Sequence, residues 1–256
     1  MVILHFLIYS GLYVLPDLLT PEVQLALLYR LLHRDLSNPN HRTNVHLHHY
    51  LAYPPFSSPM PARSFFCQEK AFTFPPKDPA VHKPVTIAAF LEKKLRWMTL
   101  GGQYDWTAKR YPSEDPPPFP SDIKQLLKRL FPDMDAQAAI VNFYSPGDTL
   151  SIHRDVSEYC DRGLISISIG CDGLFIVGNQ DATETATIRL RSGDAVYMTG
   201  SSRYAWHGVP KIIPNTCPSW LAGWPAGNNS DAECNIWRGW MANKRINVNV
   251  RQMMVI

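Results

Sequence analysis

The amino-acid sequence predicts an α+β protein, in which a helical and irregular first half wraps an antiparallel β-sandwich or jelly roll formed by the second half. Hydrophobic residues recur at helical spacing after Thr20 and again after Ser121. From Ala138 onward the pattern changes to short segments that alternate apolar and polar residues, most of them separated by Gly, Asp or Pro. Seven or more such segments in one region favour the sandwich or jelly roll.

Length and composition fit one globular unit. The chain has 256 residues, 45% hydrophobic and 18% charged, with a formal net charge of +3. This balance excludes disordered, fibrous and multi-span membrane proteins, and it permits a polyanionic partner without requiring one. We expect an N-terminal helical layer over 1–135 and a β-core over 136–256, integrated into one unit.

The cysteines and the N-terminus bear on location. The five cysteines are widely spaced and form no CxxC pair, which predicts reduced thiols in an intracellular protein; nucleus, cytoplasm and mitochondrion stay open. The apolar run Met1–Leu15 is too short to span a bilayer and lacks the basic start of a signal peptide. We predict a buried strand there, no membrane partner and a monomer.

Two longer helices are predicted in the first half. Thr20-Pro21-Glu22 combines a hydroxyl cap, a proline in the first turn and an acid near the positive end of the helix dipole. The leucines that follow share one face as far as Asp35. Ser121 is expected to cap a second helix, again with apolar residues on one face.

Prolines interrupt the rest of the first half. Eight lie between Pro54 and Pro84, which predicts an extended surface excursion because proline breaks helices and central strands. A short helix is expected over Thr86–Arg96, before a second proline-rich stretch from Pro112 to Pro120.

The predicted strands of the second half follow in order: AAIVNFY (138–144), TLSIHRD (149–155), LISISIG (164–170), LFIVG (174–178), ATIRL (186–190), AVYMTG (195–200) and RINVNVR (245–251). Two of them carry polar residues in patterns that suggest chemistry.

The first pattern is His153-x-Asp155. Residues two apart on a strand share a face, so the imidazole and the carboxylate are expected to point the same way. His207, on a later strand, offers a third ligand. Two histidines and one carboxylate leave open positions for a co-substrate and oxygen on Fe(II). Zinc accepts the same ligands but cannot activate oxygen.

The second pattern is the last strand, where alternation places Arg245, Asn247, Asn249 and Arg251 on one face. One interpretation is a half-buried strand with a solvated polar face. The other is an anion site, because arginine forks suit carboxylates and a dicarboxylate offers two ends.

In combination these motifs resemble the AlkB family of Fe(II)- and 2-oxoglutarate-dependent dioxygenases. The matching residues are Asn142-Phe143-Tyr144, His153-x-Asp155, His207, Arg245-x-Asn247-x-x-x-Arg251, and the supporting runs 101–107, 120–122, 166–170, 192–194 and 202–203. The run Leu95-Arg96-Trp97 leading into Gln103-Tyr104-Asp105-Trp106 is similar to the eukaryotic AlkB homologue 1 subgroup. The resemblance implies a double-stranded β-helix (jelly-roll) core with N-terminal helices and a nucleotide-recognition lid.

The resemblance also implies residue roles. His153, Asp155 and His207 would hold Fe(II), and O₂ would be the oxidant. The 2-oxoglutarate co-substrate would be held by Asn142, Tyr144, Arg245, Asn247 and Arg251, with Arg245 on its distal carboxylate. The substrate would be met by Trp106, Tyr104, Tyr111, Ser157 and Glu158. Ser157 stands where the bacterial type has an aspartate that helps read the base, so bacterial substrate preference is not expected.

The function implied is oxidative demethylation of N-methylated nucleobases, of the N6-methyladenine or N1-methyladenine type, in DNA or RNA including tRNA. The nucleic acid partner would be single-stranded or locally unpaired, because the base must leave the stack. One alternative keeps the dioxygenase chemistry and acts on a protein, as a hydroxylase or histone demethylase. Another is a nucleic-acid-binding module with an inactive site.

Overall fold

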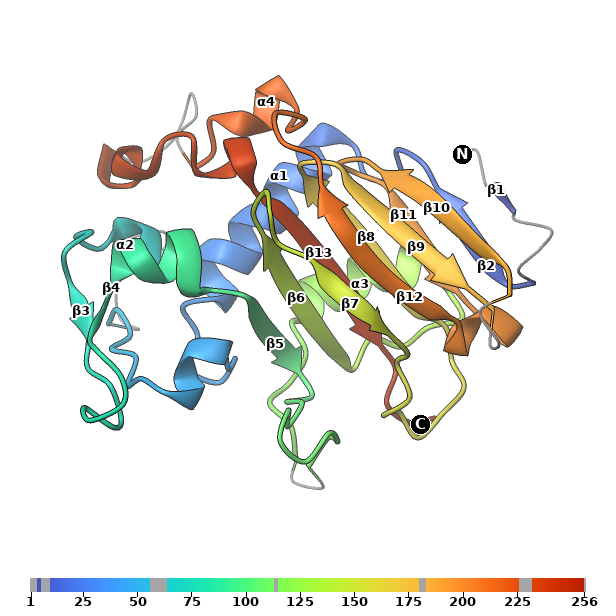
Figure 1. Cartoon of the computed structure of the whole chain (residues 1–256), viewed down its shortest axis with the longest axis horizontal. Coiled ribbons are helices and arrows are strands. Elements are labelled where there is room, and N and C mark those ends of the chain that lie inside the picture. The colour runs from blue at the N-terminus through green and yellow to red at the C-terminus, as the bar shows by residue number, and fades with distance from the viewer. Residues whose placement is uncertain are drawn as a thin grey trace.

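The computed structural model describes residues 4–5, 10–55, 64–112, 115–179, 183–225 and 232–255. Over these ranges two antiparallel sheets pack together, and helices lie mainly on one side of the pair (Figure 1). The alternating pattern of the second half therefore predicts the architecture correctly.

The larger sheet contains seven strands within the described residues, in the order β1-β2-β11-β8-β13-β6-β5. Neighbouring strands are antiparallel throughout. Their bounds are β1 Leu4–His5, β2 Leu12–Leu15, β5 Trp97–Gly101, β6 Ala138–Tyr144, β8 Leu164–Gly170, β11 Ala195–Met198 and β13 Arg245–Arg251. The first half of the chain thus supplies strands β1, β2 and β5 as well as helices. The predicted N-terminal strand is present as β2, while residues 1–3 and 6–9 lie outside the described ranges.

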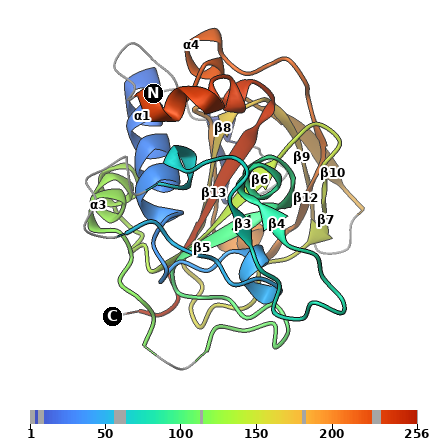
Figure 2. The same cartoon turned by 90° about the vertical axis from the view of Figure 1, so that its left-hand side faces the viewer.

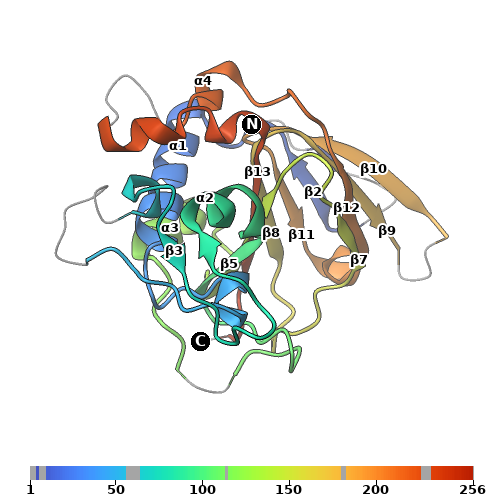
Figure 3. The same ribbon diagram turned by 60° about the vertical axis from the view of Figure 1, so that its left-hand side comes forward.

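The smaller sheet has four strands in the described chain, in the order β10-β9-β12-β7. Their bounds are β7 Leu150–His153, β9 Gly173–Gly178, β10 Thr185–Leu190 and β12 Trp206–Ile212, and a separate hairpin pairs β3 Thr73–Phe74 with β4 Val85–Thr86. This sheet lies against one face of the larger sheet, and α1 and α3 cover the other face (Figures 2 and 3).

The three predicted helical segments are present. Thr20 occupies the N-cap position of the helix that begins at Pro21, but its side chain makes no cap hydrogen bond, so the predicted hydroxyl cap is wrong. The described helices are α1 Pro21–Tyr29, α2 Ile87–Ala89, α3 Ser121–Leu130 and α4 Ser219–Ala222, with shorter or irregular turns η1 Arg30–Asp35, η2 Asn44–Leu47, η3 Phe65–Cys67, η4 Phe90–Lys94, η5 Gly200–Tyr204, η6 Ala232–Trp237 and η7 Trp240–Asn243. The cap prediction for Ser121 is wrong by one residue, because Pro120 occupies the N-cap position and Ser121 begins the helix. None of the helices in the described ranges has the length and apolarity to cross a membrane.

The proline-rich segment is not simply a surface excursion. Phe65, Phe66 and Phe74 are fully buried, and Phe65 packs edge-on against Phe90. The prolines do prevent long regular structure. The aromatic side chains between them, however, carry a large apolar surface, and its burial draws this segment into the core. Part of the predicted excursion, residues 56–63, lies outside the described ranges.

Strand β13 runs through the centre of the larger sheet, and both of its faces are buried. Ile246, Val248 and Val250 join the core that includes the leucines of α1. The alternating polar residues therefore face the smaller sheet, which excludes the first of the two interpretations, a half-buried strand with a solvated polar face. Because a central strand between two layers has no solvent side, its polar side chains must find partners inside the protein.

Candidate active site

Three potential metal ligands meet between the ends of β7 and β12. His153 and His207 are directly opposite each other in the pairing of these strands. Asp155 lies two residues past the end of β7, so the loop, and not strand alternation, brings its carboxylate to the histidines. One ligand atom from each residue lies within 4.8 Å of the other two. The Nε2 atom of His207 is 3.6 Å, and that of His153 4.0 Å, from the Asp155 carboxylate.

Backbone carbonyls orient both imidazoles. The Nδ1 of His153 lies 2.9 Å from the carbonyl oxygen of Ser151, and the Nδ1 of His207 lies 3.0 Å from that of Ala205. A carbonyl only accepts, so each Nδ1 carries the proton and each Nε2 keeps its lone pair for a metal. Burial, together with the neighbouring His207, lowers the pKa of His153, which favours the neutral imidazole that binds metal.

The carboxylate of Asp155 is fixed as an anion. Burial alone would raise its pKa, but the positive charge of the Arg251 guanidinium brings the pKa well below its usual range. Nη2 of Arg251 donates to Oδ1 at 2.7 Å, and Asn249 approaches Oδ2 at 3.5 Å. The set of two imidazoles and one carboxylate matches the ligands of non-haem Fe(II) oxygenases.

Arg203 organises the loop that carries Asp155. Its side chain is 1% exposed and donates to the carbonyl oxygens of Arg162 and Asp155 and to the carboxylate of Glu158. Glu158 also pairs with Arg251 and is itself 3% exposed in its side chain. Glu158 thus lies inside an ion-pair network, which does not fit the predicted contact with substrate. The pair Ser202-Arg203 is part of the family resemblance in the sequence, but that resemblance predicts no role for Arg203.

A second group of buried polar side chains lies along β13, at Arg245. Its Nη2 donates to Ser168 at 2.9 Å, and its guanidinium lies 5.6 Å from the ring centre of Tyr144. Among the described residues, Arg245 Nε and Nη1 and the Tyr144 hydroxyl are buried without a hydrogen-bond partner. Buried polar atoms are normally paired, so this cluster of unpaired donors fits an absent carboxylate.

Gly173 leaves room for that guanidinium. A Cβ at this position would lie 2.7 Å from Arg245 Nε and 3.0 Å from its Cδ. We expect Gly173→Ala to displace the guanidinium and raise the KM for 2-oxoglutarate by about tenfold, which corresponds to about 1.4 kcal/mol. Steady-state kinetics at varied 2-oxoglutarate check this. An unchanged KM would show that Arg245 does not bind the co-substrate. Gly178→Ala, whose Cβ would meet no atom closer than 3.4 Å, is the matched control.

The other three predicted 2-oxoglutarate residues lie on the same side of the larger sheet. Asn142 and Asn247 are cross-strand neighbours. Asn247 donates to Ser166 Oγ at 2.7 Å and to the carbonyl oxygen of Ile167 at 3.1 Å. Arg251 contacts Asp155, Glu158 and Tyr111, so in this structure it supports the candidate metal ligand Asp155. Ser166 and Ser168, which hold Asn247 and Arg245, had no predicted role.

The predicted substrate residues form an aromatic group after β5. The ring centres of Tyr104 and Trp106 are 4.9 Å apart, and those of Tyr104 and Tyr111 are 5.2 Å apart. The Tyr104 hydroxyl lies 3.5 Å from Ser157 Oγ, and the Tyr111 hydroxyl accepts from Arg251 at 3.3 Å. Trp106 is 41% exposed. The aromatic group therefore extends from solvent to the residues around the metal ligands.

Comparison with known proteins agrees with this geometry. The 2OG-Fe(II) oxygenase superfamily profile matches residues 11–251. The N6-methyladenosine RNA demethylase ALKB1 of Pyricularia oryzae is 50% identical over 265 residues, covering 95% of this chain and 74% of the relative. The tRNA demethylase abh1 of Schizosaccharomyces pombe is 39% identical, covering 95% and 79%. Human nucleic acid dioxygenase ALKBH1 is 39% identical over 49% of this chain and 34% of its own.

A solved structure shows the same fold. The structure of OsALKBH1 superimposes with a TM-score of 0.61 over 98% of this chain and 99% of its own, at 18% sequence identity. At this identity the likeness concerns the fold alone. The profile match and the identity to ALKB1 carry the assignment, which agrees with the two imidazoles and one carboxylate. The chain therefore belongs to the 2OG-Fe(II) oxygenase superfamily, in its AlkB branch, and uses Fe(II), 2-oxoglutarate and O₂.

Proposed function

We propose that this dioxygenase removes methyl groups from N-methylated adenine in nucleic acid, of the N6-methyladenine or N1-methyladenine type, in RNA, including tRNA, or in DNA. One observation carries the proposal: an aromatic group runs from the exposed Trp106 through Tyr104 to the buried Tyr111 and lies beside the residues that surround the candidate iron ligands. Aromatic rings stack on flipped bases of any sequence. Relatives with nucleic acid demethylase names support the same substrate class.

The residue assignments form part of this proposal. His153, Asp155 and His207 would hold Fe(II) through two Nε2 atoms and one carboxylate oxygen. Arg245 and Tyr144 would bind the distal carboxylate of 2-oxoglutarate, with Asn142 and Asn247 lining its path toward the metal. We also infer that the two sheets constitute a double-stranded β-helix and that residues 102–111 act as the recognition lid.

The residues of this chain position the groups bound in the site and shield them from water. With the cofactors bound, the site supplies the oxidation of an N-methyl group to a hydroxymethyl group that leaves as formaldehyde, while 2-oxoglutarate becomes succinate and carbon dioxide. Carbonyl oxygens at Ser151 and Ala205 hold the proton on each Nδ1, so both histidines keep one orientation. Arg251 keeps Asp155 ionised. Arg245 and Asn247 are buried, so a co-substrate bound against them would be shielded from water.

The direct test measures formaldehyde and succinate from protein loaded with Fe(II). Oligonucleotides carrying N6-methyladenine, N1-methyladenine or 3-methylcytosine are compared as RNA and as DNA, in single strands and duplexes, and reactions without 2-oxoglutarate are the control. Formaldehyde that requires a methylated adenine supports the proposal, and single strands are expected to react fastest. Succinate that forms at the same rate with and without every oligonucleotide would overturn it and direct attention to a protein substrate.

Trp106 provides a test of base binding. We expect Trp106→Ala to raise the KM for a methylated oligonucleotide by about 10-fold or more, because stacking on an aromatic ring contributes about 1–3 kcal/mol per base. The KM for 2-oxoglutarate should stay unchanged, because the described ring contacts of Trp106 are with Trp97 and Tyr104 and not with Arg245 or Tyr144. Trp220→Ala is the matched control: Trp220 is equally exposed, at 41%, but lies on α4 at the other end of the molecule (Figure 1). Equal effects of the two substitutions would show that Trp106 is not part of the substrate site.

A further inference from the structure

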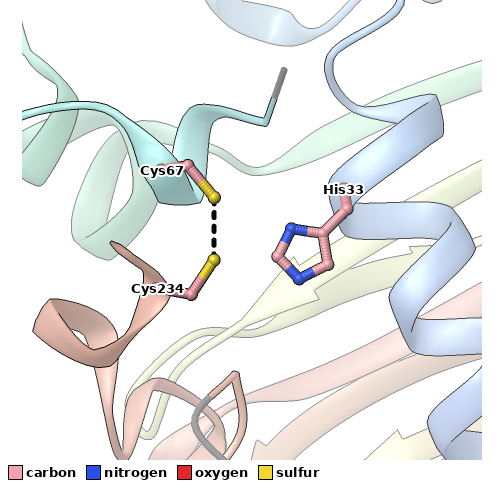
Figure 4. Close-up of side chains that lie close together, drawn as sticks. All are labelled: His33, Cys67 and Cys234. Atoms are coloured by element: carbon pink, nitrogen blue, oxygen red, sulfur yellow. Dashed lines mark hydrogen bonds between the residues drawn. The ribbon is translucent and has the colours of Figure 1, made fainter. Parts of the chain in front are cut away.

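A second cluster of metal-ligating side chains lies away from the iron ligands. It contains His33 on η1, Cys67 on η3 and Cys234 on η6, with one ligand atom of each residue within 4.8 Å of the others. The two sulfur atoms are 2.7 Å apart, and the imidazole of His33 faces them (Figure 4). These residues come from three separate parts of the sequence, so the fold and not local spacing assembles the cluster.

The imidazole of His33 is held in a form that can bind metal. Its Nδ1 lies 2.9 Å from the hydroxyl of Ser64, which leaves Nε2 for a ligand when Nδ1 carries the proton. His33 is 2% exposed, and burial lowers its pKa to about 4, so the ring is neutral at physiological pH. Metal-binding histidines commonly have such an outer hydrogen-bond partner on the second nitrogen.

Aromatic side chains pack against His33. The ring centre of His33 is 5.2 Å from that of Trp224 and 5.8 Å from that of Phe66. Cys234 is 2% exposed, and Ser64 is fully buried. Thiolate and imidazole are the preferred ligands of structural zinc, and one metal ion can bind all three of these ligand atoms at once.

We propose that His33, Cys67 and Cys234 bind a structural zinc ion that fastens the N-terminal half of the chain to the segment before β13. Thiolate sulfur and imidazole nitrogen are the usual ligands of structural zinc, and a water molecule or another donor completes its four positions. Binding converts the two thiols to thiolates and releases their two protons to solvent. The site is distinct from the iron ligands, which include no sulfur.

The sulfur positions require a small adjustment on binding. Zinc–sulfur bonds of about 2.3 Å in a tetrahedral site hold two sulfurs about 3.8 Å apart, against 2.7 Å in this structure. A side-chain rotation of about 30° at one cysteine moves its sulfur by roughly 1 Å, a change of the size that off-rotamer side chains accommodate. Both cysteines lie in short 3₁₀ turns and not in strands of either sheet, so the sheets can remain as they are.

The role of this site follows from where its ligands sit. Cys234 lies on η6, in the segment that leads through η7 into β13, the strand that carries Arg245 and Arg251. His33 follows α1, which packs on the outer face of the larger sheet. Zinc at this point would connect α1 and the segment before β13 to η3. Removal of the zinc is therefore expected to lower the melting temperature of the chain without removing an iron ligand.

The test uses cobalt(II) as a spectroscopic probe, added without oxygen to the fully reduced, metal-free whole chain. Thiolate ligands give cobalt an intense charge-transfer band in the near ultraviolet, which a site of histidines and a carboxylate does not produce. We expect this band in the wild-type chain and in His153→Ala, and its loss in Cys67→Ser and in Cys234→Ser. Added zinc should abolish the band. Cys217→Ser, at a partly buried cysteine outside the cluster, is the matched control and should keep it.

Zinc content and affinity provide the second measurement. Without iron, the wild-type chain should bind one zinc more than Cys67→Ser, by elemental analysis after gel filtration. Ser64→Ala should weaken zinc binding about 10- to 100-fold in competition with a chelator, as expected for loss of an outer hydrogen-bond partner. Absence of the thiolate–cobalt band in the wild-type chain would overturn the proposal, and this result depends on no variant that must fold. A band that survives both cysteine substitutions would overturn it equally.

Discussion

Asp155→Ala is expected to reduce kcat/KM by at least a thousandfold and to release most of the iron. Asp155 offers the one carboxylate in the group it forms with His153 and His207. Without it only the two imidazoles remain, and the positive charge of Fe(II) is no longer balanced by a protein carboxylate. A thousandfold loss corresponds to about 4 kcal/mol of transition-state stabilisation, at 1.36 kcal/mol for each factor of ten.

The same substitution also removes the partner of a buried cation. Arg251 has a side chain that is 5% exposed and loses its 2.7 Å contact with Oδ1, although its contact with Glu158 remains. Removing one member of a buried ion pair is usually strongly destabilising, and the contact with Glu158 should offset part of this cost. We therefore expect a lower melting temperature in Asp155→Ala, and a smaller decrease in Asp155→Asn, which keeps the shape and can still accept a hydrogen bond.

Activity, iron content and melting temperature together test this prediction. Asp122→Ala is the control, because Asp122 is also ion-paired, to Arg34, but its side chain is 34% exposed and lies on α3 outside the metal ligands. Its substitution should leave iron and turnover unchanged, since partly exposed ion pairs contribute little. Full iron occupancy in Asp155→Ala would exclude Asp155 as a ligand.

The site illustrates which features a sequence can predict. His153, Asp155 and His207 were identifiable because their residue types and order resemble a known motif, and the structure does bring them together. Strand alternation does not explain why His153 and Asp155 point the same way, because β7 ends at His153. Alternation along β13 predicted correctly which side chains share a face, but not that this face is buried. Burial depends on the smaller sheet, which no local pattern places.

Supporting residues were harder to find, because their roles depend on contacts between distant segments. Arg203 and Glu158 are 45 residues apart, and their ion pair fixes the loop after β7. Nothing in the spacing of either residue indicates that contact. The substrate assignment of Glu158 followed only its position near the motif. Gly173 likewise has no sequence signal, because its role depends on the side chain of Arg245, which lies against it.

Arg245→Met is expected to raise the KM for 2-oxoglutarate by about 100-fold while leaving iron binding unchanged. Two charge-assisted hydrogen bonds from one guanidinium to a carboxylate contribute on the order of 3 kcal/mol, which is about a hundredfold in affinity. Arg245→Lys should recover only part of this loss, because an ammonium group cannot form the paired contact. Kinetics at saturating and limiting 2-oxoglutarate separate the effect on KM from any effect on kcat.

Thermal stability distinguishes this role from a purely structural one. Arg245 is 1% exposed, burial lowers its pKa, and two of its nitrogens have no partner among the described residues. A buried cation without its anion is costly, so replacing it with an apolar side chain of similar length should leave the melting temperature without 2-oxoglutarate equal or higher. Saturating 2-oxoglutarate should stabilise the wild-type chain and have little effect on Arg245→Met, because only bound ligand shifts the unfolding equilibrium. If Arg245 instead served the fold, the methionine variant would melt earlier in both conditions and would respond to 2-oxoglutarate as the wild type does.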